Sequence, residues 1–224
     1  MGAHGKLNIE VSIEPSFQEN SFLLWCDGAS DCWLVDPGIP SEQTTRLLAT
    51  IEQQGLEPAA IVITHCHADH IAGIPTLRSR LGEIPIVCPR DEAHMLTSAE
   101  DNLSAQIGLP LTTPPADQLV AHGDRLTLGA LSWKVLDVAG HSPGGVAYYC
   151  EEVGVALVGD AVFAESIGRY DFPHSSRERL LTNIRDNLLT LPGETVVYSG
   201  HGPAATIKQI REFNMTLRWE LEQC

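Results

Sequence analysis

Titratable side chains are concentrated in one short segment, IVITHCHADHIAG, which spans residues 61–73. Four of them carry the nitrogen or oxygen atoms that zinc-class ions prefer, namely His65, His67, Asp69 and His70. In an extended chain, positions 65 and 67 point to the same side while Cys66 points to the other. Asp69 and His70 follow where the chain turns toward a helix, so we expect them to face a neighbouring point. The segment therefore predicts a metal site at the end of a buried strand.

Three more candidate ligands stand at the ends of strand-like segments later in the chain. The segments WKVLDVAG, VALVGD and TVVYSG lead to His141, Asp160 and His201. In layered α/β folds, ligands collect at the carboxyl ends of strands, so we expect these residues to converge on the first segment. One zinc ion takes about four ligands, and a catalytic zinc leaves one position to water. Seven protein donors therefore suit two ions, and the two oxygens of Asp160 suit a bridge between them.

Apolar periodicity predicts the elements that position these residues. The expected strands cover residues 6–13, 19–26, 31–36, 59–64, 84–89, 125–129, 131–140, 144–150, 153–160 and 194–200. The expected helices run from Ser41 to about Gln54, from Ile74 to Leu81, over 175–191 with Ser175 and Glu178 as a capping box, and from Ala205 onward. Residues 90–123 are typical of two short helices and a Pro-rich loop, which often cover a binding cleft. We expect one domain, residues 1–224, with this insertion at about 90–123.

The composition limits the possible functions. The chain has 224 residues, 43% of them hydrophobic and 19% charged, which is typical of a globular protein with a substantial core. The formal net charge of −15 disfavours nucleic acid and anionic membranes, because both are bound mainly through Lys and Arg. The sequence shows no apolar run of membrane-spanning length and no secretion signal. Six scattered cysteines without a CxxC pair predict reduced thiols in a cytoplasmic protein. A small-molecule substrate is the expected partner, and the oligomeric state is left open.

The order of these motifs resembles the metallo-β-lactamase superfamily. The chain has Thr-His-x-His-x-Asp-His from Thr64, followed by Gly-His-x-x-Gly, Gly-Asp and Gly-His, and the resemblance extends from about residue 7 to 210. It implies an α/β fold of the four-layer αββα sandwich type. It also implies that one metal is held by His65, His67 and His141, the other by Asp69, His70 and His201, and that Asp160 bridges them.

Within this superfamily the chain resembles small glyoxalase II-like proteins, also described as hydroxyacylglutathione hydrolase-like. This resemblance implies a thioesterase that acts on a substrate such as S-lactoylglutathione. Two divalent ions, expected to be zinc with iron or manganese as alternatives, would hold a bridging hydroxide that attacks the carbonyl carbon. Asp69 and Asp160 are the catalytic candidates, with Asp69 orienting the nucleophile. The chain leaves room for about one helix after His201, so the glutathione contacts of the larger enzymes do not carry over.

Other functions remain as alternatives. Persulfide dioxygenases share the motif but use one iron, which would here be held by His65, His141 and Asp160. A non-catalytic metal-binding interaction domain is a further possibility. Zinc β-lactamases usually have Cys or Ser where this chain has Asp160, which disfavours antibiotic hydrolysis. Nuclease branches generally carry basic surfaces, which the charge of this chain does not predict.

Residues near the predicted cleft supply candidate substrate contacts. Arg169 and Tyr170 follow Asp160 in the segment IGRYDFP, and His174 precedes a predicted helix. The alternatives are a buried structural pair between Arg169 and Asp171 and a turn-filling role for His174. Cys66 is expected to be a core thiol. His4, His94 and His122 have no motif around them and are expected at the surface.

Overall fold

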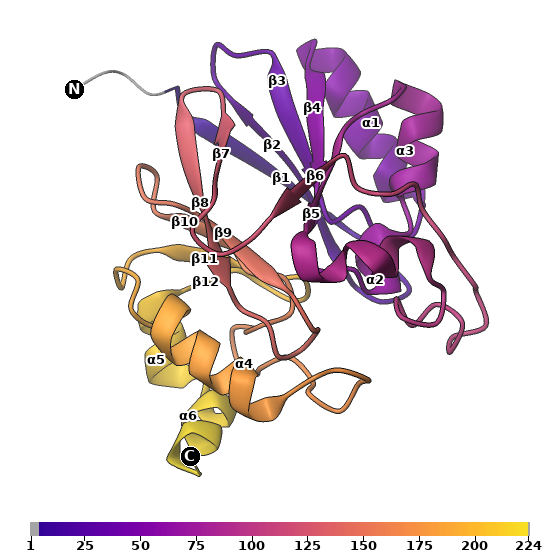
Figure 1. Ribbon diagram of the computed structural model, residues 1–224. Helices are drawn as coiled ribbons and strands as arrows, with labels where there is room; N and C mark the ends of the chain where they lie inside the picture. The colour runs from indigo at the N-terminus through magenta and orange to yellow at the C-terminus, as the bar shows by residue number, and fades with distance from the viewer. Residues whose placement is uncertain (1–4, 224) are drawn as a thin grey trace.

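The computed structural model describes residues 5–223, so the predictions for His4 and Cys224 lie outside the described residues. Two mixed β-sheets form the centre of the molecule (Figure 1). The N-terminal sheet contains, in spatial order, β1 (Leu7–Ile13), β2 (Asn20–Cys26), β3 (Asp31–Val35), β4 (Glu57–Val62), β5 (Ile86–Pro89) and β6 (Gln118–Val120). The C-terminal sheet contains β12 (Ala205–Thr206), β11 (Val196–Tyr198), β10 (Val155–Leu157), β9 (Val146–Cys150), β8 (Leu131–Asp137) and β7 (Arg125–Leu128). Helices cover the outer face of each sheet, which confirms the αββα sandwich for the described part of the chain.

Alternation of side chains along the strands decides which layer each residue joins. In β2, Phe22 and Leu24 enter the core between the two sheets, while Leu23 faces the outer helices. Trp33 and Trp133 meet across the inter-sheet core, with ring centroids 5.6 Å apart. Each large side chain buried in this way contributes about 1.5–3 kcal/mol to folding. Successive residues of a strand point to opposite faces, and here both faces are buried, one by the other sheet and one by helices. The strand is therefore apolar at successive positions, as expected for a sheet covered on each side.

Each sheet carries its own set of helices. The N-terminal sheet is covered by α1 (Glu42–Gln54) and α3 (Ile74–Leu81), and the C-terminal sheet by α4 (Arg177–Asn183), the π-helical turn η2 (Ile184–Leu188), α5 (Ile207–Phe213) and α6 (Met215–Glu222) (Figure 1). Ser41 caps α1 as predicted, because its hydroxyl accepts a hydrogen bond from the backbone N–H of Gln43 at 3.2 Å.

Three sequence predictions need correction in detail. Ser176, not Ser175, caps α4, because Ser175 instead donates its hydroxyl to the Phe172 carbonyl at 2.7 Å and completes the preceding turn. Residues 90–123 contain a 3₁₀ helix, η1 (Arg90–Thr97), and a series of turns rather than two helices, and their last part forms β6 along the open edge of β5. The C-terminal segment begins with β12 and forms two helices that meet at Asn214.

The described cysteines agree with the prediction of reduced thiols. Cys26, Cys32, Cys66, Cys88 and Cys150 are free and buried. Cys66 lies in the core beneath α1 and α3, where its sulfur is 3.4 Å from that of Cys88. It therefore points away from the neighbouring histidines, as the alternation predicts.

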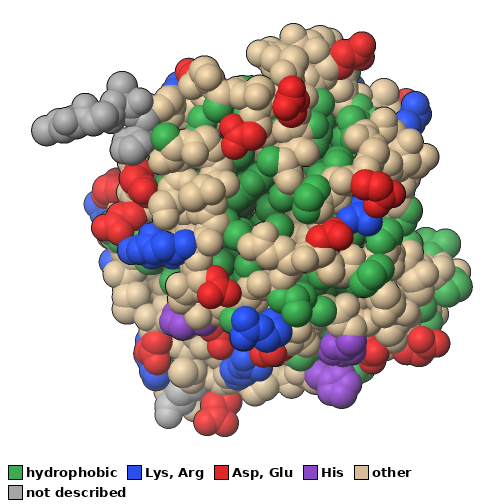
Figure 2. Space-filling model, turned by 45° about the horizontal axis from the view of Figure 1, so that its top comes forward, with side chains coloured by type: hydrophobic (Ala, Val, Ile, Leu, Met, Phe, Trp, Pro, Cys, Tyr) green, Lys and Arg blue, Asp and Glu red, His purple; other side chains and the backbone are tan. Residues whose placement is uncertain are grey.

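Charge is dispersed on the face drawn in Figure 2. Acidic and basic side chains are scattered over this face and do not form a continuous basic area. Among residues 5–223, no helix has both the length and the apolar character that crossing a membrane requires.

Candidate metal centre

The predicted ligands all lie at one end of the two sheets, in the loops that follow strands and in one short helix. His65 and His67 come between β4 and the short helix α2 (Ala68–Ile71), which itself carries Asp69 and His70. His141 lies between β8 and β9, Asp160 follows β10, and His201 follows β11. The structure therefore brings together all seven side chains that the sequence predicts as ligands. Backbone hydrogen bonds join the two sheets here, including one from Val146 N–H to the Thr64 carbonyl at 2.9 Å.

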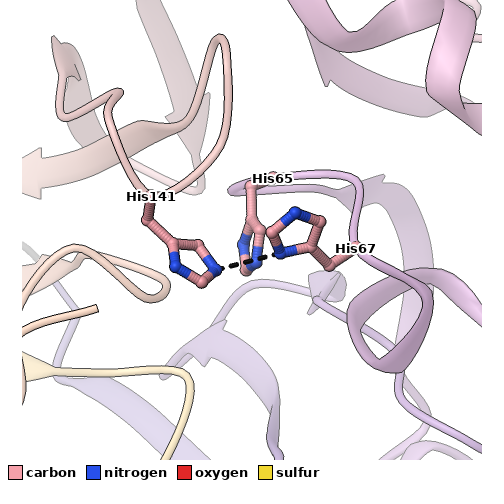
Figure 3. A group of neighbouring side chains, drawn as sticks. All are labelled: His65, His67 and His141. Atoms are coloured by element: carbon pink, nitrogen blue, oxygen red, sulfur yellow. Dashed lines mark hydrogen bonds between the residues drawn. The ribbon is translucent and has the colours of Figure 1, made fainter. Parts of the chain in front are cut away.

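A first group consists of His65, His67 and His141. One ring nitrogen from each lies within 4.8 Å of the others, a spacing that could hold a metal ion. His67 Nδ1 and His141 Nε2 are 2.9 Å apart, and the three rings turn toward one another, two from the loop before α2 and one from the loop between β8 and β9 (Figure 3). Two of these residues precede α2 and the third belongs to the other sheet, so the group spans the interface between the two halves of the molecule.

A second group consists of Asp69, His70 and His201, and it meets the same spacing criterion. His201 Nε2 lies 3.4 Å from Asp69 Oδ2, and His70 Nε2 lies 3.8 Å from the same oxygen. These are imidazole and carboxylate donors, which suit a divalent ion.

Asp160 lies between the two groups. Its Oδ1 is 3.5 Å from His70 Nε2, and its Oδ2 is 3.6 Å from His141 Nε2 and 3.4 Å from His201 Nε2. The carboxylate therefore faces nitrogens of both groups at once.

Groups outside the cluster hold three of its imidazoles in a fixed orientation. His141 donates from Nδ1 to the Arg169 carbonyl at 2.8 Å, and His201 donates from Nδ1 to the Phe17 carbonyl at 3.1 Å. His70 Nδ1 lies 3.3 Å from Asp36 Oδ2. Since the Nδ1 atoms of His141 and His201 donate to backbone carbonyls, the Nε2 atoms of these two rings are directed toward the cluster.

Asp36 is an outer residue that the sequence analysis did not single out. It is fully buried with a φ of 45°, and its carboxylate accepts hydrogen bonds from the backbone N–H and the hydroxyl of Thr64 at 2.7 and 2.6 Å. Asp36 also lies close enough to His65 and His70 to form a third possible ligand group, but its bonds to Thr64 engage both of its oxygens. An Asp at the end of a strand and before a proline resembles an ordinary turn residue, so its sequence context indicates this role only weakly.

Glu92 is a second buried residue that the sequence analysis missed. Its carboxylate accepts hydrogen bonds from the backbone N–H groups of Cys66 at 2.5 Å and Gly144 at 2.8 Å, and from the hydroxyl of Ser142. Cys66 stands between His65 and His67, and Ser142 follows His141. Glu92 therefore joins the two loops that carry the first group, although nothing in its sequence context indicates this role.

The pKa values of the cluster divide according to group. Burial lowers the pKa of His65, His67 and His141, with that of His67 reaching about 3, and neighbouring imidazoles add to the effect. Burial also disfavours the charged form of His70 and His201, but nearby carboxylates outweigh it. The pKa of His70 is raised well above its usual value, and that of His201 is raised to about 10 by hydrogen bonds with Asp160 and Asp69.

Unpaired buried atoms indicate that the cluster fits metal ions. His65 Nε2, His70 Nε2 and Asp160 Oδ1 are buried and make no hydrogen bond in the described structure. Leaving such an atom unsatisfied costs about 1–3 kcal/mol, so a cation that accepts their lone pairs would recover that energy. Since the donors are nitrogens and carboxylate oxygens, the centre fits divalent ions of the zinc or iron class.

A cavity of about 830 Å³ opens over the cluster. His67, Asp69, His141, Asp160 and His201 line it, together with the apolar side chains of Phe17, Ala68, Leu103, Ile107, Phe163, Ala164, Ile167, Phe172 and Pro203 and the polar ones of Gln106, Glu165, Ser166 and Arg169. The ring centroid of Phe172 lies 5.2 Å from that of His67 and 5.6 Å from that of His141.

Of the predicted substrate contacts, only Arg169 lines this cavity. Its guanidinium forms two 2.9 Å hydrogen bonds with Asp171, so the predicted pair exists, but both side chains are exposed rather than buried. Tyr170 turns away, and its hydroxyl donates to Glu220 at 2.8 Å. His174 is exposed with a φ of 64° and does not line the cavity. His94 and His122 are exposed, as predicted.

With the sheets, the outer helices and this cluster in place, sequence comparison identifies the family. The model of the metallo-beta-lactamase superfamily matches residues 15–201, so the chain belongs to this superfamily. It is 31% identical over 210 residues to the hydroxyacylglutathione hydrolase GloC of Haemophilus influenzae. The matched residues make up 93% of this chain and 97% of that protein.

Solved structures agree in fold. The chain is similar to the BLEG-1 B3 metallo-beta-lactamase, with a TM-score of 0.85, 35% identity, and coverage of 94% of this chain and 98% of that one. It is also similar to TTHA1623 in a di-iron-bound form, with a TM-score of 0.79, 32% identity, and coverage of 92% and 98%. The superfamily fold and the His/Asp cluster together imply an enzyme-like centre for divalent metal ions.

Proposed function

We propose that this chain is a binuclear metallohydrolase that cleaves thioesters such as S-lactoylglutathione. The position of Asp160 carries the proposal, because one carboxylate faces His70 and His201 on one side and His141 on the other. A shared carboxylate of this kind is what a pair of ions needs as a bridge. The likeness to GloC supports a hydroxyacyl thioester as the substrate.

In this proposal His65, His67 and His141 hold one ion, Asp69, His70 and His201 hold the other, and Asp160 contacts both. Two divalent ions held there would lower the pKa of a bound water and polarise the substrate carbonyl. Zinc is the expected metal.

The chain's own residues contribute orientation and exclusion of water. Asp69 lines the cavity and keeps a lowered pKa beside His70 and His201, although burial alone would raise it. Its ionised carboxylate would accept a hydrogen bond from the attacking water and so orient it. Phe172 covers His67 and His141 and limits access of bulk water. A thiolate is a good leaving group because thiols have a pKa of about 8.5, so no separate general acid is required.

Elemental analysis combined with a thiol-release assay tests the proposal. We expect about two zinc-class ions for each chain and release of glutathione from S-lactoylglutathione. Metal-loaded protein that releases no thiol from any thioester would contradict it.

Two other activities follow from specific observations and can be measured on the same preparation. Asp160 disfavours β-lactam hydrolysis, but the likeness to a B3 metallo-beta-lactamase makes it worth measuring, and a chromogenic cephalosporin would detect it. The likeness to a di-iron protein keeps iron chemistry open. A persulfide dioxygenase with one iron on His65, His141 and Asp160 would consume oxygen with glutathione persulfide, and the proposed hydrolase would not. Metal-loaded protein inert in every assay would favour a non-catalytic interaction domain.

We further propose that residues 1–224 act as one domain in the cytoplasm. Its buried free thiols support a reducing compartment.

A further inference from the structure

Outside the candidate ligands, the cavity over the metal centre is lined mainly by apolar side chains. We call Phe17, Leu103, Ile107, Phe163 and Phe172 the apolar wall, since all five line the same cavity as the candidate ligands. The wall reaches the cluster itself, because the ring of Phe163 lies 6.1 Å from that of His201 and the ring of Phe172 lies 5.2 Å from that of His67. A molecule held at the metal centre is therefore in contact with the wall.

The wall is fixed in place rather than loosely covering the site. Asn102, which is fully buried, accepts a hydrogen bond from the backbone N–H of Ala68 at 2.9 Å, so the segment with Leu103 and Ile107 is attached to the start of α2 beside His67. The Asn102 side chain also donates to the carbonyls of Met95 and Leu111 at 3.1 and 3.0 Å. On the other side, the carbonyl of Phe17 accepts the hydrogen bond from His201.

The wall keeps apolar surface in contact with water. Phe17 is 39% exposed and Ile107 is 45% exposed. Covering such surface is favourable in proportion to its apolar area, so an occupant with an apolar group gains affinity here.

Charge in the cavity does not favour an anionic occupant beyond the ligand cluster. The charged side chains that line it outside the cluster are Arg169 and Glu165. Arg169 directs Nε and Nη2 to the carboxylate of Asp171, so its charge is already compensated. Glutathione carries two carboxylates, whereas the cavity outside the cluster offers mainly apolar surface, the neutral side chains of Gln106 and Ser166, one carboxylate and a guanidinium that is already paired. The part of a thioester that the wall can hold is therefore its acyl chain.

We propose that the apolar wall is an acyl-chain site and that the substrate is a carboxylic thioester whose acyl group is an uncharged aliphatic chain longer than a lactoyl group. This inference rests on the proposed thioesterase function and specifies its substrate class. Hydrolysis adds water across the C–S bond, and the products are the fatty carboxylate, the thiol and the proton that the acid loses. During the reaction the acyl chain would lie along the wall, with its carbonyl end at the candidate ligands.

A chain-length series tests the inference. Thioesters of N-acetylcysteamine, an uncharged thiol, are compared from acetyl to octanoyl on zinc-loaded protein. We expect kcat/KM to rise about fourfold for each methylene that the wall covers. Succinyl thioester, which ends in a carboxylate, should react at least about tenfold more slowly than butanoyl thioester.

Two neighbouring residues give a matched pair of variants. Ile107→Asn removes part of the wall and should flatten the dependence on chain length. Leu109→Asn changes a residue of the same segment that is 60% exposed and does not line the cavity, so it should leave the dependence unchanged. Rates that do not rise with chain length, or equal effects of the two variants, would overturn the acyl-chain site while leaving the thioesterase intact.

If no turnover is observed, the binding of product carboxylates tests the acyl-chain site independently of the proposed thioesterase function. Calorimetry with zinc-loaded protein should show octanoate binding more tightly than acetate, and Ile107→Asn should reduce that difference. If no thioester is hydrolysed but this pattern holds, the proposed thioesterase is wrong and the acyl-chain site stands. Equal binding of the two carboxylates would overturn the acyl-chain site.

Discussion

The two ligand groups at the metal centre use the same imidazole chemistry in opposite electrostatic settings. In the first group burial dominates, and the pKa values of His65, His67 and His141 fall below the usual value. In the second group the carboxylates of Asp69 and Asp160 reverse the effect of burial, and the pKa of His201 rises to about 10. Neighbouring residues, rather than residue type, decide the protonation of a histidine here.

This difference predicts different behaviour toward metal. A neutral imidazole offers its lone pair directly, whereas a protonated one must first lose its proton. Metal binding at Asp69, His70 and His201 should therefore release more protons near neutral pH than binding at the first group. Asp160 faces both groups, so changes to it should have the largest effect.

Asp160→Ala removes the carboxylate that faces both groups. We expect kcat/KM for the thioester to fall by about 10³-fold or more, because the proposed bridging ligand is lost, while the far-ultraviolet circular dichroism stays unchanged. Asp186→Ala, which removes an exposed carboxylate on the helical layer, is the matched control. Unchanged turnover in Asp160→Ala would show that the two groups do not depend on a shared ligand.

Glu92→Gln affects only the first group. One of the three donors now held by the carboxylate would face an NH₂ group, so we expect about 10–100-fold weaker zinc binding and a loss of about 1–3 kcal/mol in the free energy of unfolding. Zinc titration against a chelating dye measures the zinc affinity. The titration is done in a His201→Gln background, in which the first group keeps all its ligands and the second group has lost one. Glu83→Gln, at an exposed carboxylate, is the control. Wild-type affinity in Glu92→Gln would contradict the positioning role.

The pH dependence of stability separates the groups in metal-free protein. Below pH 6.5 the histidines of the unfolded chain become protonated, whereas His65, His67 and His141 stay neutral in the folded protein because their pKa values are lowered. The free energy of unfolding therefore falls as the pH falls. Above pH 6.5 folded His70 and His201 keep protons that the unfolded chain loses, so stability falls as the pH rises toward 10. Each limb has a slope of up to about 1.4 kcal/mol per pH unit for each proton.

Urea unfolding with a chelator present measures both limbs. His67→Gln should flatten the acid limb and leave the alkaline one, and His201→Gln should do the opposite. If both variants changed the same limb, the electrostatic contrast between the groups would be wrong.

Arg169→Ala should have the smallest effect. The backbone carbonyl that accepts the hydrogen bond from His141 stays in place, and the lost guanidinium is exposed and already paired with Asp171. We expect a change in KM of about threefold or less and an unchanged kcat for an uncharged thioester. A change of about 100-fold in KM would show that Arg169 binds the substrate directly.

Local sequence pattern predicted a large part of the fold and the centre. Strand ends and turn residues placed His141, Asp160 and His201 at the carboxyl ends of strands, and alternation placed Cys66 opposite His65 and His67. These signals are local, because a side chain's face and a helix cap depend on residues a few positions away. Local pattern misplaced one cap, because it predicted Ser175 whereas Ser176 caps α4 in the structure.

Which residues hold the candidate metal ligands in place was decided only by the packing of the two sheets. Glu92 reaches Cys66, Ser142 and Gly144 because η1 lies against both loops, and Asp36 reaches His70 because β3 pairs with β4. Phe17 and Ile107 meet in one cavity although a long stretch of chain separates them.

The sequence by itself thus determined which residues can donate to metal and which strand ends present them. Only the tertiary structure decided which imidazoles are neutral, what orients them and what the cavity wall is made of. The physical reason is that donor chemistry belongs to each side chain, whereas pKa, orientation and burial belong to neighbours that folding brings from distant parts of the chain.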